Sequence, residues 1–207
     1  MARIDGVSPK GAGFTVRIAY WFTRRQIGRL AGRSPDGLLG PVQMYAHVPV
    51  LLRGYGRLEQ ATAKLTQLDQ RYKALAELKA ATLTRCEYCI DLGSQIARRW
   101  GLSDEQLLAL PFYATSPLFT PVDKLVLDFA TGMSRTPVEV PETLVTALRQ
   151  HFDEAQIVEL THVIALENLR GRFNLALGVD AAGFSDGMVC AVPVPGPAAA
   201  EPGPVLG

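Results

Sequence analysis

The sequence has little cysteine and little histidine, no surplus of charge of either sign and no long apolar run. Lys and Arg total 21 against 20 Asp and Glu, which gives a net charge of +1. This balanced charge does not favour binding to the negatively charged backbone of a nucleic acid. No apolar run reaches the roughly 18 residues that a membrane-spanning helix needs. The first residues also lack the apolar core of a signal peptide. We therefore expect a cytoplasmic protein with no membrane and no nucleic-acid partner.

Cysteine occurs only 3 times, and only Cys86 and Cys89 are close together. In a cytoplasmic protein such a pair is more often redox-active or metal-binding than structural. A C-x-x-C at the start of a helix is the sequence form of a dithiol/disulfide redox site. The free N–H groups and the positive end of the dipole at a helix start stabilise a thiolate. We therefore predict that Cys86 is the nucleophile and Cys89 the resolving thiol.

Two other interpretations of the cysteine pair remain open. A zinc site would need two further ligands, and no other closely spaced pair of ligand residues exists. The remaining cysteine and histidines are Cys190, His47, His151 and His162. The pair could also be inert and buried. The redox interpretation is favoured, and we expect no bound metal and no cofactor.

The apolar pattern predicts one all-α domain, because no run of alternating β-branched residues with hairpin turns is present. Residues 1–13 are expected to form an irregular arm, 14–190 the helical domain, and 191–207 a disordered tail rich in Pro, Ala and Gly. The expected helices cover residues 14–30, a short piece from Pro41, a second piece from Pro49 to about 65, 70–84, 90–100, a short piece after Ser103, 122–133, 143–152 and 153–177.

Charged residues stand out in two places. Residues 1–40 contain seven Lys and Arg against two Asp, for which a solvated helix face is the favoured explanation and a basic amphipathic segment on a membrane or a partner the alternative. In the last long helix, Glu167 and Arg170 have i,i+3 spacing and can pair on one face. We expect that pair to fix helix packing or a subunit contact.

Three separated segments carry a resemblance to a known family. They are ELKAATLTRCEYCIDLG at 77–93, YAHVP at 45–49 and ENLRGRFN at 167–174. In order and spacing they resemble the carboxymuconolactone decarboxylase family, and more specifically its alkylhydroperoxidase D-like branch, over residues 14–190. The resemblance implies an all-α fold of antiparallel helices around a helix hairpin that carries the C-x-x-C. It also implies a homo-oligomer (trimer or hexamer), a peroxide or disulfide substrate and a lipoyl- or thioredoxin-type reductant.

The family's proton relay is missing from this sequence. The best-known pattern has a glutamate twelve residues before the first cysteine, a histidine between the cysteines and another four residues after the second. Ala74, Tyr88 and Gly93 occupy those positions here. The sequence therefore lacks all three residues that the family's route to peroxide reduction uses.

Two substitutes for the relay can be predicted from spacing. Glu77 lies one helical turn after Ala74 and can supply a carboxylate. Gly93 lies one turn after Cys89, so another side chain can fill the space beside that sulfur, and His47 is the first candidate and His162 the second.

The leading hypothesis is thus a thiol–disulfide redox protein that reduces a peroxide or relays electrons through Cys86 and Cys89. A catalytically weak helical oligomer or redox sensor is the alternative. Lactone decarboxylase chemistry ranks last, because the resemblance implies that the decarboxylase members use a site without the cysteine pair.

Overall fold

The computed structural model describes residues 2–32 and 40–194, and within these ranges all regular structure is helical. The elements are α1 (Phe14–Ala31), α2 (Gly40–Tyr45), α3 (Pro49–Thr62), α4 (Gln70–Thr84), α5 (Glu87–Arg99), α6 (Asp104–Ala109), the 3-10 turn η1 (Leu110–Phe112), α7 (Pro121–Ser134), α8 (Glu142–Leu148) and α9 (Glu154–Leu177). The all-α prediction is confirmed. None of the helices in the described ranges is both long and apolar enough to cross a bilayer.

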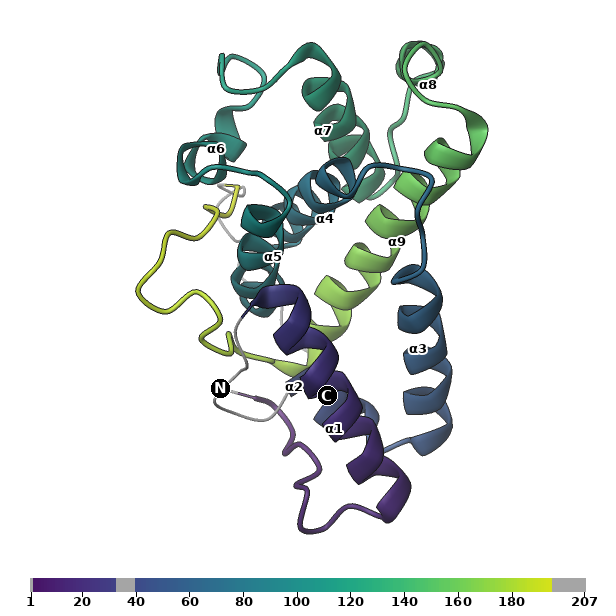
Figure 1. Cartoon of the computed structure of the whole chain (residues 1–207), viewed down its shortest axis with the longest axis vertical. Helices are drawn as coiled ribbons and strands as arrows, with labels where there is room; N and C mark the ends of the chain where they lie inside the picture. Colours follow the sequence, from purple (N-terminus) through teal and green to yellow (C-terminus); the bar gives the residue numbers. More distant parts are fainter. Residues whose placement is uncertain (1, 33–39, 195–207) are drawn as a thin grey trace, which may run out of the picture.

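Helix α4 is the centre of the fold and packs against α5, α7 and α9 (Figure 1). Its start follows from Asp69, whose side chain accepts a hydrogen bond from the N–H of Arg71. The helix is rich in alanine and leucine and is buried over most of its length. Its buried residues, which include Lys73 and Lys79, lie on all sides of the helix, so neighbouring helices cover it on all sides.

Two apolar clusters meet at this central helix. Leu75, Leu78 and Ala81 of α4 belong to a cluster with α1, α2, α5 and the segment after α9. Ala76 and Ala80 belong to a second cluster with α7, α8 and α9. The redox motif lies in the first cluster, so its position is fixed by the hairpin of α4 and α5.

Local signals set most helix starts. Ser103, Thr120 and Asp153 each form a capping box with the side chain three residues later. Pro49 stands in the first turn of α3, where a missing N–H costs nothing. The prediction of a helix over 70–84 is confirmed, and the other expected long helices agree to within a few residues.

Both ends of the described chain bond to the helical domain. The N–H of Arg3 donates to the carbonyl of Leu177, and the N–H of Val194 donates to the carbonyl of Thr82. Most of the tail that was expected to be disordered (195–207) lies outside the described residues.

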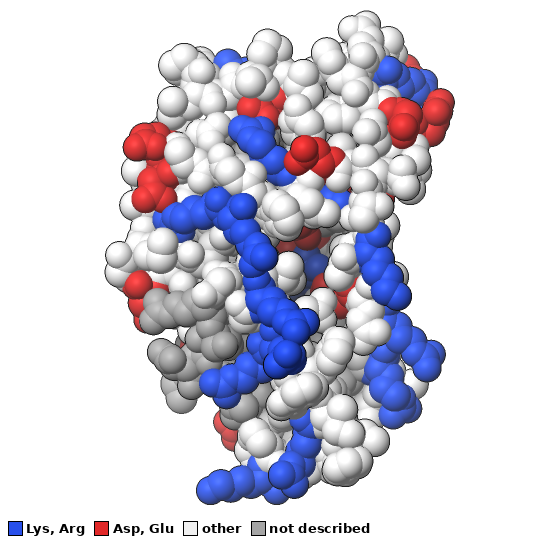
Figure 2. Space-filling view, viewed as in Figure 1, with Lys and Arg blue, Asp and Glu red and all other residues white. Residues whose placement is uncertain are grey.

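Lys and Arg side chains form two bands on one face, over α1 and over α3 (Figure 2). The exposed arginines of these helices are Arg17, Arg24, Arg25, Arg29, Arg53 and Arg57. The arginines of α1 thus lie on an exposed helix face, whereas Arg3 lies in the N-terminal arm and Arg33 lies outside the described residues. Whether water or a partner covers this face stays a prediction. Beside them on α1, the apolar side chains of Phe14, Ile18 and Trp21 are also exposed.

Candidate active site

Cys86 and Cys89 form a disulfide at the turn between α4 and α5, with their Cα atoms 5.2 Å apart. Arg85 ends α4 in the left-handed conformation (φ 60°), and Cys86 is then the N-cap of α5. The Sγ atom of Cys86 accepts a hydrogen bond from the N–H of Cys89 at 3.2 Å. The sulfur of Cys86 therefore occupies the position at a helix start where negative charge is most favoured.

Both cysteines are buried, with exposed fractions of 1% for Cys86 and 7% for Cys89. The third cysteine, Cys190, is a half-buried free thiol. Within the described residues, no group of three or more His, Cys, Asp and Glu side chains is placed to hold a metal ion.

Asn174 of α9 covers the disulfide. Its Nδ2 atom lies 3.5 Å from the Sγ of Cys86 and 3.5 Å from the Sγ of Cys89. Its Oδ1 atom is buried and has no hydrogen-bond partner among the described residues. Sequence reasoning placed Asn174 in a family-like segment but gave it no role. A usable signal existed, because Glu167, Arg170 and Asn174 are spaced i, i+3 and i+7 on one helix face.

A charged cluster lies one turn before Asn174 on the same helix. The guanidinium of Arg170 donates to Glu59 of α3 (2.7 and 2.9 Å), to Glu77 of α4 (2.9 Å) and to Glu167 of α9 (2.9 Å). The Glu167–Arg170 pair expected from spacing thus forms and joins α9 to α3 and α4. The Oε1 atom of Glu167 is buried without a partner among the described residues.

One guanidinium cannot keep three neighbouring carboxylates fully ionised. Burial raises the pKa of Glu167 to about 7, more than the charge of Arg170 lowers it. Burial likewise raises the pKa of Glu77. For Glu59 burial acts in the same sense, but the charge and hydrogen bonds of Arg170 outweigh it, so the pKa of Glu59 lies below its usual value. The cluster therefore holds a proton near neutral pH.

Tyr88 stands between the two cysteines and is buried against Phe184, edge to face at 6.0 Å between ring centroids. Burial and the nearby charge of Asp91 raise the pKa of its hydroxyl. Asp91 accepts hydrogen bonds from the backbone N–H groups of Ala182, Phe184 and Ser185. The carboxylate of Asp91 thus ties the segment after α9 onto the redox helix.

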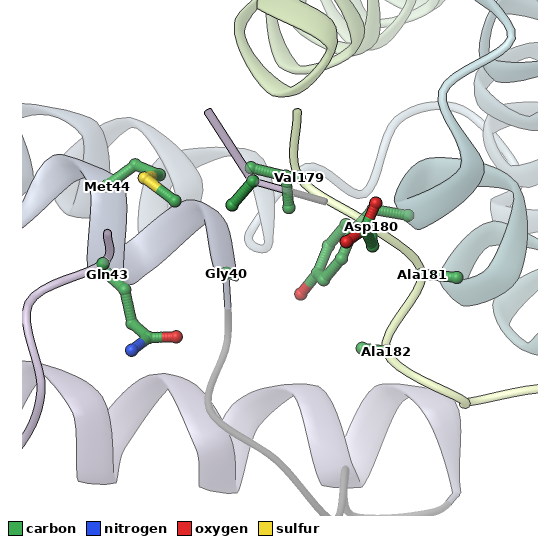
Figure 3. A pocket seen from close by; sticks show the side chains of 10 residues that line it. Gly40, Gln43, Met44, Val179, Asp180, Ala181 and Ala182 are labelled. Atoms are coloured by element: carbon green, nitrogen blue, oxygen red, sulfur yellow. The ribbon is translucent and has the colours of Figure 1, made fainter. Parts of the chain in front are cut away.

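Tyr88 also lines a pocket of about 370 Å³. Gln43 and Met44 of α2 lie on one side of it, and Asp180 with Ala182 of the segment after α9 lie on the other (Figure 3). Neither cysteine is among the described residues that line it. The pocket reaches the middle of the C-x-x-C motif but not its sulfurs.

The space beside Gly93 is filled by Leu78, whose Cδ1 would lie 3.3 Å from a Cβ at that position. The expectation that His47 or His162 fills it is therefore wrong. The Nε2 of His47 contacts the carbonyl of Asp5 at 2.8 Å and so holds the N-terminal arm. The Nε2 of His162 contacts Thr62 Oγ1 at 2.8 Å and joins α9 to α3. The ring of His47 thus contacts the N-terminal arm and the ring of His162 contacts α3.

Glu77 faces α9 rather than a histidine relay, because its carboxylate is bound by Arg170. The structure thus brings together Cys86, Cys89 and Asn174 as one group, with Glu77 in the neighbouring cluster. A proton-transfer role for Glu77 or His47 stays a prediction.

Comparison with known proteins identifies the family. The sequence profile of the carboxymuconolactone decarboxylase family matches residues 49–132. The uncharacterised protein YnjA of Escherichia coli K12 is 34% identical over 169 residues, which cover 79% of this chain and 86% of YnjA. This chain belongs to the carboxymuconolactone decarboxylase family. The resemblance seen in the three sequence segments is confirmed.

Solved structures with the family's helical fold are similar over most of the chain. The debrominase Bmp8 in its apo form superposes with a TM-score of 0.70 at 20% identity, covering 86% of this chain and 91% of Bmp8. The alkylhydroperoxidase AhpD core protein of Ralstonia eutropha JMP134 superposes with a TM-score of 0.69 at 20% identity, covering 87% of this chain and 92% of that one. These likenesses establish the alkylhydroperoxidase D-like fold.

Proposed function

We propose that this protein is a thiol–disulfide oxidoreductase in which Cys86 and Cys89 cycle between dithiol and disulfide, with a peroxide as the oxidant. The disulfide at the start of α5 carries the proposal, because the same turn that closes it also places the Cys86 sulfur on a helix N-terminus. A sulfur held this way is activated without a neighbouring histidine. Family membership and the peroxidase-related fold neighbours agree with a redox role.

The oxidative half of the cycle needs two steps. The Cys86 thiolate attacks the peroxide, an S–O bond forms, the O–O bond breaks, and the departing oxygen takes up a proton as an alcohol or water. The Cys89 thiol then attacks the sulfenic sulfur, the S–S bond forms, and water leaves. Burial of both sulfurs favours a small peroxide over a folded protein disulfide as the oxidant, and for the same reason it favours a lipoyl group over a folded thioredoxin-type protein as the reductant.

The reductive half requires a dithiol from outside the chain. A lipoyl- or thioredoxin-type reductant would form a mixed disulfide with Cys89 or Cys86, and its second thiol would release the reduced pair. NAD(P)H-coupled consumption of peroxide through either relay tests the whole cycle. We expect loss of turnover in Cys86→Ser and in Cys89→Ser, and retention in the matched control Cys190→Ser. Equal turnover in the Cys86→Ser/Cys89→Ser double variant would exclude the proposal.

A separate experiment tests which of the two cysteines is the nucleophile and which is the resolving thiol. Each single Cys→Ser variant would be treated with iodoacetamide at neutral pH, with Cys190 replaced in both. Faster labelling of Cys86 than of Cys89 is expected, because Cys86 is the N-cap. The opposite order would reverse the assignment of nucleophile and resolving thiol.

A redox sensor of low turnover is the second candidate. It is favoured by the surroundings of Gly93, where a leucine, Leu78, is the neighbouring side chain and the relay imidazole of the family pattern is missing. A sensor would have a reduction potential within the range of cellular thiol systems, so its disulfide would form and be reduced there, but it would consume peroxide slowly.

One solved structure of the debrominase Bmp8 holds 2,3,4-tribromopyrrole. That compound therefore also belongs among the substrates to be assayed.

We also propose that the chain forms a homo-oligomer, a trimer or hexamer. Phe14 of α1 is 76% exposed and Trp21 is 64% exposed, and a second copy could cover such side chains. Light scattering coupled to size exclusion tests this, and a monomer at micromolar concentration would contradict it.

A further inference from the structure

In the contact between Asn174 and the disulfide, only the amide nitrogen of the side chain has a partner, and the amide oxygen has none among the described residues. The Nδ2 group lies within hydrogen-bond distance of both sulfurs, at 3.5 Å from each. The Oδ1 atom, in contrast, is buried and has no donor among the described residues. A disulfide has no S–H, so it cannot offer a donor to this oxygen. Leaving a buried acceptor unpaired costs free energy, and here that cost falls on the oxidised state.

Reduction changes what the sulfurs offer. The Cys86 sulfur, already an acceptor for the N–H of Cys89, can carry the negative charge, and Nδ2–H can donate to it. The Cys89 thiol gains an S–H next to the Asn174 amide, whose Nδ2 atom contacts the Cys89 sulfur in the disulfide form. A turn of the carboxamide that keeps Nδ2 on Cys86 and brings Oδ1 toward Cys89 lets this S–H donate to Oδ1. A thiolate and a thiol side by side thus match both halves of one carboxamide.

We propose that Asn174 is a catalytic residue whose carboxamide is complementary to the reduced pair, with Nδ2–H donating to the Cys86 thiolate and Oδ1 accepting from the Cys89 thiol. The inference rests on the proposed redox function and assigns it a residue outside the family's relay pattern. Asn174 favours the reduced form over the disulfide and makes the Cys86 thiol more acidic.

The redox step balances with an external dithiol. The disulfide accepts two electrons and one proton, the S–S bond breaks, and the products are the Cys86 thiolate and the Cys89 thiol. The partner dithiol becomes a disulfide and releases the remaining proton to solvent. Asn174 takes part only through hydrogen bonds, so the same step proceeds without it at a less favourable equilibrium.

Two variants separate the halves of the carboxamide. Asn174→Leu removes the donor and the acceptor, while Asn174→Asp keeps an acceptor of the same size and adds a negative charge. The pKa of the Cys86 thiol would be followed by thiolate absorbance near 240 nm in a Cys190→Ser background. We expect a rise of about one pH unit in Asn174→Leu, which is a tenfold change, and a larger rise in Asn174→Asp.

The dithiol–disulfide equilibrium is the second readout. Against a glutathione buffer, Asn174→Leu should shift the pair roughly tenfold toward the disulfide, which lowers the reduction potential by about 30 mV for this two-electron couple. A residue that only fills space would alter stability without moving either quantity. Arg170 with its carboxylates and Asp91 on α5 are unchanged in these variants, so differences between them report on position 174.

Asn168→Leu is the matched control. Asn168 is also a buried asparagine of α9, but its Nδ2 donates to Ser134 and to the carbonyl of Ile164, away from the sulfurs. This variant should change neither the thiol pKa nor the redox equilibrium. The proposal is overturned if Asn174→Leu and Asn174→Asp, shown to be folded by circular dichroism, keep the parent thiol pKa and equilibrium. If both quantities shift while peroxide turnover is absent, only the proposed oxidant is wrong and the role of Asn174 stands.

Discussion

Replacing Glu167 by glutamine should stabilise the protein at alkaline pH and not in acid. Burial raises the pKa of Glu167 to about 7 in the folded state, against 4.5 for an unperturbed glutamate. A raised folded-state pKa stabilises the fold while the carboxyl is protonated, and this contribution is lost as the pH rises through 7. Glutamine keeps the shape and the acceptor for Arg170 but never acquires the charge.

The magnitude follows from the size of the shift. From 4.5 to about 7, at 1.36 kcal/mol per pH unit, the ionised carboxylate costs the native state roughly 3 kcal/mol. Urea unfolding of the oxidised protein at intervals between pH 4.5 and pH 8 would measure this contribution to the free energy of unfolding. The free energy of unfolding of Glu167→Gln should exceed that of the parent at pH 8 and approach it at pH 4.5.

A second glutamate on the same helix provides a control of opposite sign. Glu159 is buried too, and burial raises its pKa, but the N–H groups of Leu68 and Gln67 and the side chain of Lys73 outweigh burial, so the pKa is lowered. Its contribution is present above the unfolded-state pKa and is lost in acid. Glu159→Gln should therefore destabilise the fold at pH 8 and lose that effect on acidification. Parallel pH profiles for the parent and Glu167→Gln would refute the reasoning about the cluster.

Three further substitutions test other parts of the structure. Arg85→Gly should raise the free energy of unfolding by roughly 0.5–1 kcal/mol in urea titrations, because glycine accepts the positive φ of this residue without strain. Asp91→Asn should cost roughly 2 kcal/mol and speed proteolysis after residue 180, because an amide cannot accept all three N–H bonds that the carboxylate accepts. Gly171→Ala should cost roughly 1–3 kcal/mol, because its Cβ would lie 2.6 Å from Thr84 Oγ1, and Thr84→Ala should recover part of this loss in the double variant.

Much of the fold could be predicted because its signals are local. Asp69, Ser103 and Asp153 cap helices where the sequence pattern predicts a start, and each caps through its own side chain. The apolar pattern predicts the redox helix from Ile90, whereas α5 begins at Glu87. The reason is that Cys86 acts as the N-cap, a position that serine, threonine, aspartate and asparagine usually take.

The histidines show where spacing alone fails. His47 and His162 were candidates for the space beside Gly93 because few other titratable side chains were available. In the structure a leucine of the neighbouring helix fills that space. Which side chain faces a given glycine depends on how α4 packs against α5, and the one-dimensional pattern does not contain that packing. Glu77 was placed on the right helix, but its partner Arg170 was expected to pair with Glu167 alone.

The sequence pattern does not predict the role of Asn174, because its position depends on a contact between helices that are far apart in the sequence. Gly171 lies against Thr84, with no room for a side chain between them, so α9 passes close to the end of α4. The disulfide follows directly after that end of α4, and Asn174 follows Gly171 by about one turn of α9. The close approach therefore brings the carboxamide onto the two sulfurs, while Arg170, next to Gly171, reaches the carboxylates of α3 and α4. One glycine thus sets the position of both polar groups, which explains why the redox pair and the charged cluster lie side by side along α9.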